Sequence, residues 1–501
     1  MTNFETIEQP KLQWAAQWLK DIKGSYINGE WLTTGPATIS SINPANGSVV
    51  GAYYEATTND VDTAIVSARQ ALTNSDWKTI SKKQRAKIMH QIAGLIYEHQ
   101  AELATLEALD NGKLYSEAYN DDVQECAELF EYYAGWTDKY YAENNPVNGD
   151  FLSVTTVDPI GVCAQIVPFN FPLQMACLKM APALSMGNTL LLKPSNKTSF
   201  SAIRLFEIIA EANILPAGTI NLILGKSKLG SHMSTHAGVD KLSFTGSTNV
   251  GKQLVRDSAD SNLKPVTLEL GGKSPNILFA DYAKRDEAIE KSFYALFTHK
   301  AEKCSSPTRL FVEKSIYNEV VEKMAAFADA YKLGDPFDPS SDQGAQISTE
   351  HMESILGYIE SGIEQGARVA AGGYRDIEGE NVHGCFVRPT IMADVTNDMK
   401  IAQEEIFGPV LCVIPFETEE EVIAQANDTI YGLGAGLWTA DMSRAHRVAN
   451  QLEAGMVFVN KYGCYDFASP FGGVKQSGWG KEYAIHSLAA FTKKRAIWFA
   501  Y

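Results

Sequence analysis

Glycines, small polar residues and a lysine follow one another in this chain at spacings that could hold a phosphate-bearing ligand. They come directly after apolar, strand-like runs: Pro168 to Pro172, Lys193 to Asn196, Gly225 with Gly230, Thr245-Gly246-Ser247, and Gly271-Gly272. Parallel sheets bind ligands at the carboxyl ends of their strands, and a helix opening at Ser247 would favour an anion at its N-terminus. The series predicts a bound dinucleotide, although the sequence has no GxGxxG fingerprint. Ordinary turn chemistry explains any one of these segments taken alone.

The elements that must position these residues alternate between strand and helix. The first block has expected strands at 162–167, 189–193, 220–224, 242–245 and 266–270, with helices at 173–185, 200–212 and 247–257, preceded by helical stretches at 61–71 and 82–109. A second block has strands at 310–312, 410–416 and 455–459, with helices at 316–331, 352–365 and 420–427. Such alternation is typical of βαβ units, and hence of parallel sheets covered by helices on both faces.

Two alternating segments, 151–157 and 496–501, lie outside both blocks. Strands that are left over from two complete sheets often pair with another subunit, so we expect an oligomer.

Composition narrows the class of protein. A chain of 501 residues with 45% hydrophobic and 21% charged residues fits a globular protein of two or three domains. The net charge of -17 argues against nucleic acid or an anionic membrane as a partner, and simple solubility explains it. The N-terminus has no secretory pattern and no apolar stretch is long enough to span a bilayer. We therefore expect a cytoplasmic protein that neither spans nor binds a membrane.

The seven cysteines, at 126, 163, 177, 304, 385, 412 and 464, have no CxxC pair. In a cytoplasmic chain they predict reduced thiols, mostly buried, rather than disulfides or a zinc site. No His/Cys cluster suggests a metal, and none is expected.

Six segments together resemble the aldehyde dehydrogenase superfamily, in its NAD(P)-dependent, non-acylating branch. They are PFNFP at 168–172, KPS at 193–195, FTGS at 244–247, LELGGK at 268–273, EEIFGPV at 404–410 and SPFGG at 469–473. Their order and spacing over several hundred residues make the resemblance specific. It implies a three-part α/β fold with a Rossmann-like cofactor domain, an α/β catalytic domain and a small β oligomerisation arm.

The resemblance implies how the reaction would run. Cys304, followed five positions later by Arg309 and the strand LFV, matches the family's nucleophile, whose thiolate would add to an aldehyde carbonyl. Asn170 and the Cys304 backbone N–H would stabilise the oxyanion. After hydride transfer to the nicotinamide, Glu269 would activate the water that hydrolyses the thioester. Lys193, which matches the residue on the adenine ribose, completes this catalytic set.

The implied product is a free carboxylic acid. The alternative is a relative that passes the acyl group to coenzyme A. Glu269 argues against it, because such relatives lack a carboxylate at this position. A catalytically impaired structural protein is a second alternative, opposed by Cys304, Asn170 and Glu269 together.

The implied cofactor is NAD or NADP. Glu405 matches the residue that holds the nicotinamide ribose, and Phe407 flanks that ring. The full set of expected cofactor contacts is Ile166, Pro168, Phe169, Asn170, Lys193, Ser195, Asn196, Gly225, Gly230, Phe244, Thr245, Gly246, Ser247, Glu269, Leu270, Gly271, Glu405 and Phe407. Many relatives have Glu where this chain has Asn196. Because a carboxylate on the ribose favours NAD, its replacement predicts that NADP is tolerated.

The loop before Cys304 departs from the family pattern. It reads Ala301-Glu302-Lys303, where relatives have Gly-Gln and a variable residue, and Pro307 stands where Gly is common. Ala and Pro restrict a backbone that Gly leaves free. This change could slow loop movement between the two half-reactions, or mark a member with altered activity.

The expected substrate tunnel combines charged, aromatic and small residues: Glu125, Phe171, Leu178, Thr298, Lys303, Ser305, Tyr465 and Phe471. Lys303 could favour the thiolate, could pair with Glu125, or could be a solvated charge at the tunnel mouth. Glu125 could select a cationic or hydroxylated aldehyde. Leu178 and Thr298 replace larger aromatics of relatives and predict a wider tunnel.

The resemblance also predicts the domain organisation. The cofactor domain is expected at 1–140 and 159–272, the catalytic domain at 273–471, and the oligomerisation arm at 141–158 and 485–501. A homodimer or homotetramer is expected, with a small-molecule aldehyde as substrate.

Overall fold

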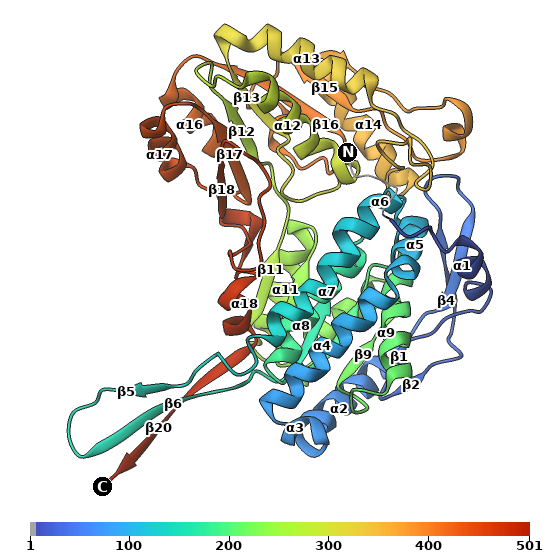
Figure 1. The fold of residues 1–501 in the computed structure, drawn as a ribbon, viewed down its shortest axis with the longest axis vertical. Coiled ribbons are helices and arrows are strands. Elements are labelled where there is room, and N and C mark those ends of the chain that lie inside the picture. The colour runs from blue at the N-terminus through green and yellow to red at the C-terminus, as the bar shows by residue number, and fades with distance from the viewer. Residues whose placement is uncertain (1–6) are drawn as a thin grey trace.

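The computed structural model describes residues 7–501, and an eight-stranded sheet forms its lower half in Figure 1. The strand order is β19-β11-β10-β7-β8-β9-β1-β2. Five central strands run parallel: β7 (Val162–Ile166), β8 (Thr189–Lys193), β9 (Ile220–Leu222), β10 (Lys241–Thr245) and β11 (Val266–Glu269). The antiparallel edge strands are β1 (Tyr26–Ile27), β2 (Glu30–Trp31) and β19 (Gly478–Trp479). The parallel core of the predicted first block is confirmed.

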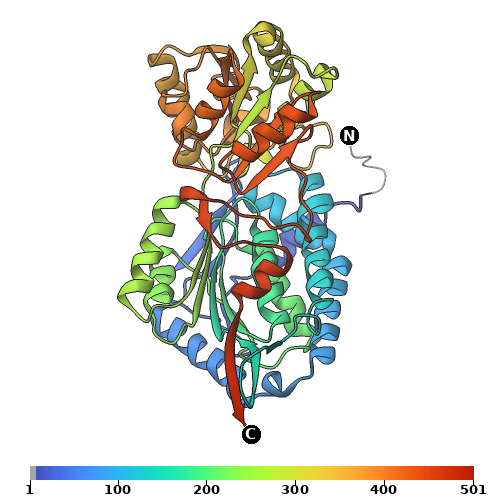
Figure 2. The same cartoon turned by 90° about the vertical axis from the view of Figure 1, so that its left-hand side faces the viewer.

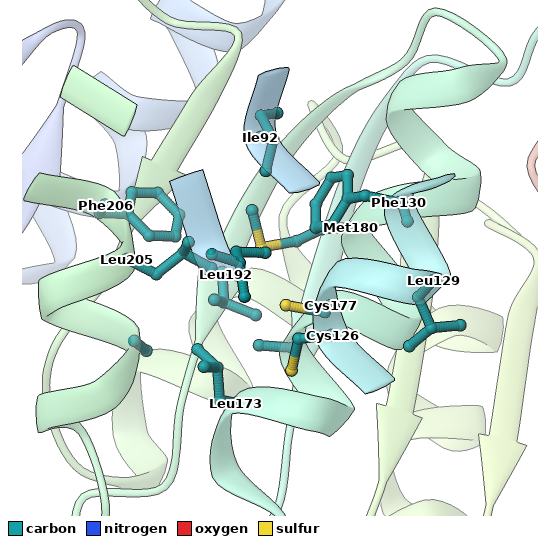
Figure 3. Packing of buried hydrophobic residues seen from close by; sticks show 14 of the residues in the cluster. Ile92, Cys126, Leu129, Phe130, Leu173, Cys177, Met180, Leu192, Leu205 and Phe206 are labelled. Carbon is teal, nitrogen blue, oxygen red and sulfur yellow. The ribbon is translucent and has the colours of Figure 1, made fainter. Parts of the chain in front are cut away.

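Helices cover both faces of this sheet. One face packs α4 (Lys82–Glu98), α5 (Gln100–Asn111), α7 (Gln124–Ala134), α8 (Pro172–Ser185) and α9 (Phe200–Ala212) around a single apolar cluster. Figure 3 shows Ile92, Phe130, Met180, Leu192 and Phe206 of that cluster, drawn from four helices and β8. The other face carries α2 (Thr58–Asn74), α10 (Ser227–Thr235) and α11 (Thr248–Asp260). The strands are consequently buried on both sides, as in doubly wound folds.

The structure corrects two boundaries in this block. The stretch 82–109 forms two helices, because His99, with φ −106° and ψ 18°, ends α4 before α5 begins. Helix α2 is longer than the expected 61–71, because Thr57 and Asp60 form a capping box that starts it at Thr58. A π-helical turn at Ala118–Val123, between α6 (Tyr115–Glu117) and α7, was not expected.

A seven-stranded sheet forms the upper half, in the order β14-β15-β16-β13-β12-β17-β18. Its strands are β12 (Pro275–Leu278), β13 (Arg309–Glu313), β14 (Arg368–Ala371), β15 (Thr390–Ala393), β16 (Val410–Phe416), β17 (Gly434–Trp438) and β18 (Met456–Val459). Helices α12 (Arg285–Phe297) and α13 (Tyr317–Ala330) cover one face, and α14 (Thr349–Glu364), α16 (Glu419–Asn427) and α17 (Met442–Gln451) the other. Figure 2 shows the half that contains the seven-stranded sheet above the half that contains the eight-stranded sheet, with the C-terminal segment running from the upper half to the lower.

A three-stranded antiparallel sheet extends away from the body (Figure 1). It contains β5 (Glu143–Asn145), β6 (Phe151–Pro159) and β20 (Thr492–Ala500). The two segments that we expected to pair with another subunit pair with each other within the chain, where β20 aligns with all of β6 from Phe151 to Pro159. Within the range 485–501, the first residues belong to helix α18 (Ala484–Ala490), which contacts α8.

The remaining elements are short. They are α1 (Leu12–Trp18), α3 (Asp76–Thr79), α15 (Lys400–Gln403) and the hairpin of β3 (Thr38–Ile42) with β4 (Val49–Tyr54). Between residues 7 and 501, no helix combines the length and the apolar character needed to cross a bilayer. Five of the seven cysteines are buried, as predicted, whereas Cys304 is half-buried and Cys464 exposed.

Candidate active site

A cavity of about 530 Å³ opens between the carboxyl edge of the first sheet and the loop that precedes β13. Every residue expected in the substrate tunnel lines it: Glu125, Phe171, Leu178, Thr298, Lys303, Ser305, Tyr465 and Phe471. Of the expected cofactor contacts, it is lined by Pro168, Phe169, Asn170, Thr245, Gly246, Ser247, Glu269, Leu270, Gly271, Glu405 and Phe407. Cys304 also faces it. One cavity therefore joins both predicted sets.

Arg309 fixes the strand that follows Cys304. Its guanidinium is fully buried and donates to the carbonyl of Lys273 at 2.9 Å, to Asn397 Oδ1 at 2.8 Å and to the carbonyl of Ala426 at 2.8 Å. These bonds tie the start of β13 to neighbouring loops of the upper half. The nucleophile candidate thus leads into a rigid strand rather than a mobile loop.

The surroundings of Cys304 disfavour its ionisation. Burial, together with the carboxylates of Glu405 and Glu269, raises the pKa of this thiol to about 12. Lys303 does not offset this effect. Its ammonium donates to the carbonyl of Ala295 at 2.8 Å and to Thr298 Oγ1 at 2.7 Å, and burial lowers its pKa to about 8. Lys303 is neither a solvated charge nor a partner of Glu125, so both of those interpretations were wrong.

Glu269 ends β11 and lies in the same cavity, with 4% of its surface exposed. Burial raises the pKa of its carboxyl well above the usual range, and the carboxylate of Glu482 adds to the rise. No protein group within residues 7–501 bonds to Glu269 Oε2. A carboxyl of this kind is suited to proton transfer near neutral pH.

The glycines after Glu269 allow two loops to approach closely. A Cβ on Gly271 would lie 2.3 Å from Glu405 Oε2, and a Cβ on Gly272 would lie 2.3 Å from the carbonyl oxygen of Cys304. The Gly272 N–H donates to Glu405 Oε1 at 3.0 Å. Burial raises the pKa of Glu405 to about 7. Any larger residue at either position would push Glu269, Cys304 and Glu405 apart.

Asn170 follows β7 and has 6% of its surface exposed. Its side-chain amide donates to the Glu302 carbonyl at 2.7 Å. Each amide nitrogen carries two hydrogens, so this bond uses one and leaves the other for the cavity that Asn170 lines. The bond also sets the orientation of the amide relative to the Cys304 loop.

The loop before Cys304 has an unusual backbone. His299, Lys300 and Ala301 take φ values of 52°, 61° and 57°, so three consecutive non-glycine residues are left-handed. A buried ion pair holds them, because Lys300 Nζ lies 2.9 Å from Glu302 Oε2 and donates to the Asn111 carbonyl at 2.6 Å. Glu302 Oε1 in turn accepts from the Ile347 N–H at 2.9 Å. Glu302, one of the residues that departs from the family pattern, is therefore half of a buried ion pair in this left-handed turn.

The other expected cofactor contacts lie beyond the cavity, along the same sheet edge: Ile166, Lys193, Ser195, Asn196, Gly225, Gly230 and Phe244. Ile166 aligns with both Lys193 and Phe244 across neighbouring strands. A Cβ on Gly230 would lie 3.3 Å from Ile166 and 3.6 Å from the Lys193 stem. Within residues 7–501, Lys193 Nζ makes a single hydrogen bond, at 3.3 Å to the Pro194 carbonyl, and burial lowers its pKa to about 8.

These residues fit a dinucleotide. Ser247 caps α11 by accepting from the Val250 N–H at 3.4 Å, so the expected helix N-terminus is present. Thr245 Oγ1, beside it, is buried without a partner among the described residues. A Cβ on Gly246 would lie 2.4 Å from the Phe244 ring. A glycine-lined backbone, an available helix terminus and an underused Lys193 match the needs of a pyrophosphate and its riboses.

Several residues near the site were not found from the sequence. Glu55 lies after β4, next to Gly225 and the Lys226 N–H, to which its Oε1 bonds at 3.1 Å. His351 Nε2 lies 2.8 Å from the Phe407 carbonyl. Gln174, Tyr483 and His299 also line the cavity. These come from distant segments with no motif of their own, so only the folded chain reveals them. No metal-binding group of three or more His, Cys, Asp or Glu residues occurs in residues 7–501.

Comparison with known proteins identifies the family. The aldehyde dehydrogenase family model matches residues 31–497. Aldehyde dehydrogenase 1A1 of Gallus gallus is 42% identical over 486 residues, covering 96% of this chain and 94% of that protein. The chain belongs to the aldehyde dehydrogenase family.

Solved structures agree with this assignment. An NAD+ complex of an aldehyde dehydrogenase from Bacillus cereus has a TM-score of 0.94 and 41% identity, with 99% of each chain covered. An indole-3-acetaldehyde dehydrogenase of P. syringae, a Cys-to-Ala mutant in complex with NAD+ and IAA, has a TM-score of 0.94 and 40% identity, covering 98% of this chain and 99% of that one. The predicted family and α/β fold are confirmed, and the chain is an aldehyde dehydrogenase that uses NAD(P).

Proposed function

We propose that this aldehyde dehydrogenase oxidises its substrate to a free carboxylic acid, with Cys304 as nucleophile and Glu269 as general base. The observation that carries the proposal is Glu269 itself. Its carboxyl faces the same cavity as Cys304, has an oxygen without a protein partner and has a raised pKa. A group that only supported the fold would be expected to have both oxygens bonded.

The residues divide the reaction into two stages. Cys304, deprotonated by a base, adds to the carbonyl carbon, and the new oxyanion is stabilised by Asn170 and the Cys304 N–H. Glu405 and Phe407 would hold the nicotinamide end of NAD(P)+, which would supply the acceptor for the hydride that leaves this carbon. Glu269 then takes a proton from water, the hydroxide adds to the thioester carbonyl, and the carbon–sulfur bond breaks to give the acid and the Cys304 thiolate.

Because the pKa of the Cys304 thiol is raised, the first stage of the reaction also needs a base. Because the thiol is protonated at neutral pH in the protein alone, a base must remove its proton before attack. Glu269 faces the same cavity and its charge acts on Cys304. We therefore assign the first proton transfer to Glu269 as well, and Glu269 must release this proton to solvent through the cavity before it can take the proton of the hydrolytic water.

The cofactor would extend along the sheet edge. Glu405 and Phe407 are suited to the nicotinamide end, the α11 N-terminus to the pyrophosphate, and Lys193, Ser195 and Asn196 to the adenine ribose. A coenzyme A–acylating reaction is disfavoured by Glu269, and a purely structural role by the maintained set of Cys304, Asn170 and Glu269.

The remaining expectations stay proposals. We propose a homodimer or homotetramer formed through the arm, a cytoplasmic location, and domain limits at 1–140 with 159–272, 273–471, and 141–158 with 485–501. The three-stranded sheet of β5, β6 and β20 supports the arm, since it extends from the body with both edges open.

The test of the mechanism separates the two stages. NADH formation would be followed in the wild type, in Cys304→Ser and in Glu269→Gln, each with rapid mixing at pH 7.5 to 10. We expect no turnover in Cys304→Ser. In Glu269→Gln we expect, at the higher pH where solvent hydroxide replaces the base in thiol ionisation, at most one NADH per site followed by a stall. Steady turnover by Glu269→Gln at the wild-type rate would contradict the assignment.

A further inference from the structure

We infer that the outer part of the cavity selects an aldehyde whose far end carries a positive charge, and that Glu125 is the residue that selects it. The inference rests on the proposed function, because it names the substrate class of the same site. It begins from a charged residue that the chemistry at Cys304 does not use.

Glu125 lies on α7 and lines the cavity. Its Oε2 accepts a hydrogen bond from the side-chain amide of Gln174 on α8. Among residues 7–501, no group donates to its other oxygen, and no Lys, Arg or His forms an ion pair with it. A largely buried carboxylate is normally paired with a cation, so Glu125 has unused capacity to bind one.

Among the described residues, the charged groups that shift the pKa of Glu125 are carboxylates. Asp121 and Glu128 lie close enough to act on it from its own helix and the preceding turn, Gln174 faces it from α8, and the Tyr465 and Tyr483 hydroxyls feel its charge. Burial is the main cause that raises the pKa of Glu125 to about 7, and the neighbouring carboxylates add to it. A cation bound here would relieve both effects.

The cations nearby are already engaged. Lys303 is turned to the Ala295 carbonyl and Thr298 Oγ1. Lys113 is paired with Asp122 on the same wall. Lys303 and Lys113 are not available to Glu125 without breaking buried bonds. His299, which also lines the cavity, has its Nε2 3.6 Å from Asp121 Oδ2. The ligand itself must therefore supply the charge.

Aromatic rings line the same cavity as Glu125. Tyr465, Phe471 and Tyr483 line the cavity, with ring centroids 5.8 Å apart between Tyr465 and Phe471 and 5.9 Å apart between Phe471 and Tyr483. Aromatic faces attract cations, most strongly where water is excluded. A carboxylate and aromatic rings in one cavity suit an ammonium group. An anionic tail would be repelled, and an apolar tail would desolvate Glu125 without providing a compensating interaction.

The test uses pairs of substrates that differ only in charge. Each ω-trimethylammonio aldehyde, with chains of two to six carbons, is compared with the analogue in which carbon replaces the nitrogen. We expect kcat/KM to favour the cation by about tenfold at the best chain length. Glu125→Gln should abolish most of this preference, and Glu131→Gln should keep it, because Glu131 is an exposed carboxylate on the same helix that does not line the cavity.

The pH dependence provides a second readout. A quaternary ammonium does not titrate, so its KM in the wild type should fall as pH rises from 6 to 8 and Glu125 ionises. The KM of the uncharged analogue should not follow that change, and Glu125→Gln should lose it. Equal kcat/KM for both members of every pair in the wild type, or an unchanged preference in Glu125→Gln, would overturn the inference.

Binding without turnover keeps the inference and the mechanism distinguishable. Calorimetric titration with the matching alcohols, charged and uncharged, measures the same preference when no reaction is possible. Preferred binding of the charged alcohol, lost in Glu125→Gln, supports the inference even if no aldehyde is oxidised, and that result would overturn only the mechanism. Turnover of aldehydes without any charge preference would overturn only the inference.

Discussion

Cys304 lies where the family resemblance predicts the nucleophile, but the pKa of its thiol is raised. Its raised pKa, caused first by burial and then by Glu405 and Glu269, keeps the sulfur protonated and hence protected from oxidation and alkylation. The sequence around Cys304 predicts a nucleophile but not this protection, which depends on carboxylates from distant segments.

Alkylation of the protein without cofactor should report this pKa directly. In a Cys464→Ser background, which removes the exposed thiol, inactivation by iodoacetamide should accelerate roughly tenfold per pH unit between pH 8 and 10, because the thiolate fraction keeps rising below the pKa. Intact mass would confirm that a single site reacts. A rate that levels off by pH 8 would contradict a pKa of about 12.

Cofactor choice should depend on Glu55 as well as on Asn196. Glu55 acts on Lys193 and lies beside Gly225, so it places a carboxylate near the expected ribose even though Asn196 does not. We expect Glu55→Gln to raise kcat/KM for NADP relative to NAD about tenfold, and Asn196→Glu to lower it by a similar factor. Glu30→Gln, an exposed carboxylate of β2, is the control.

Two results would decide between these contributions. If NADP gives less than about one hundredth of the kcat/KM of NAD in the wild type, the tolerance predicted from Asn196 is wrong. In that case Glu55→Gln should restore NADP use. Because burial lowers the pKa of Lys193 to about 8, use of NADP should also weaken above pH 8, where Lys193 loses its charge.

Much of the candidate site was predictable because the relevant residues stand in ordered motifs. The segments around Asn170, Glu269 and Glu405 fix which strand ends face the cavity, and the structure brings them together. Glu55, Gln174 and the Lys300–Glu302 pair could not be predicted in this way. Their roles come from side-chain contacts between segments far apart in the chain, which spacing alone does not encode.

The turn at 298–303 links three parts of the site. Lys300 bonds to the end of α5, Glu302 to Ile347, and the Glu302 carbonyl to the Asn170 amide. Each left-handed non-glycine residue costs of the order of 1 kcal/mol, so the buried pair offsets strain while it orients Asn170. Ala301 itself takes a left-handed φ of 57°, and the expectation that it stiffens this loop stays a prediction.

Breaking this pair should be more harmful than removing it. Lys300→Gln or Glu302→Gln alone leaves one buried charge unpaired, which typically costs about 3–5 kcal/mol, so we expect Tm to fall by roughly 5 °C or more. The double variant should recover much of that loss. Scanning calorimetry at one protein concentration gives the comparison; single variants within about 1 °C of the wild type would mean that the pair contributes little.

The fold itself was largely readable from periodicity. Strand β16 has the predicted limits, and α13, α14 and α16 differ from prediction by one to three residues at their ends. The break at His99 and the π-helical turn at Ala118–Val123 were not readable, because neither segment contains a Gly or Pro that would mark an interruption of the helix. The pairing of β6 with β20 is likewise a contact between opposite ends of the chain.

The arm should govern assembly. Trp498, Phe499 and Phe151 are 57%, 50% and 48% exposed on its surface, more than a monomer usually leaves uncovered on one thin sheet. We expect light scattering to give two or four times 54.9 kDa for the wild type and a lower mass for Trp498→Glu. Lys493→Gln, on the same strand, should not change it. A wild-type mass of 54.9 kDa, or an unchanged mass in Trp498→Glu, would contradict this role.

Strand β19 has a consequence for biosynthesis. Leu268 and Glu269 of β11 gain their outer neighbour only when Trp479 and Gly478 have been made. At 5–20 residues per second, the ribosome needs roughly 10–40 s to synthesise the intervening chain. Throughout that interval the nascent lower half presents the unpaired edge of β11, a template for pairing with a neighbouring polypeptide. Chaperone protection should therefore matter most for polysomes stalled between these two strands, and a chain released early would lack the strand that pairs with β11 beside Glu269.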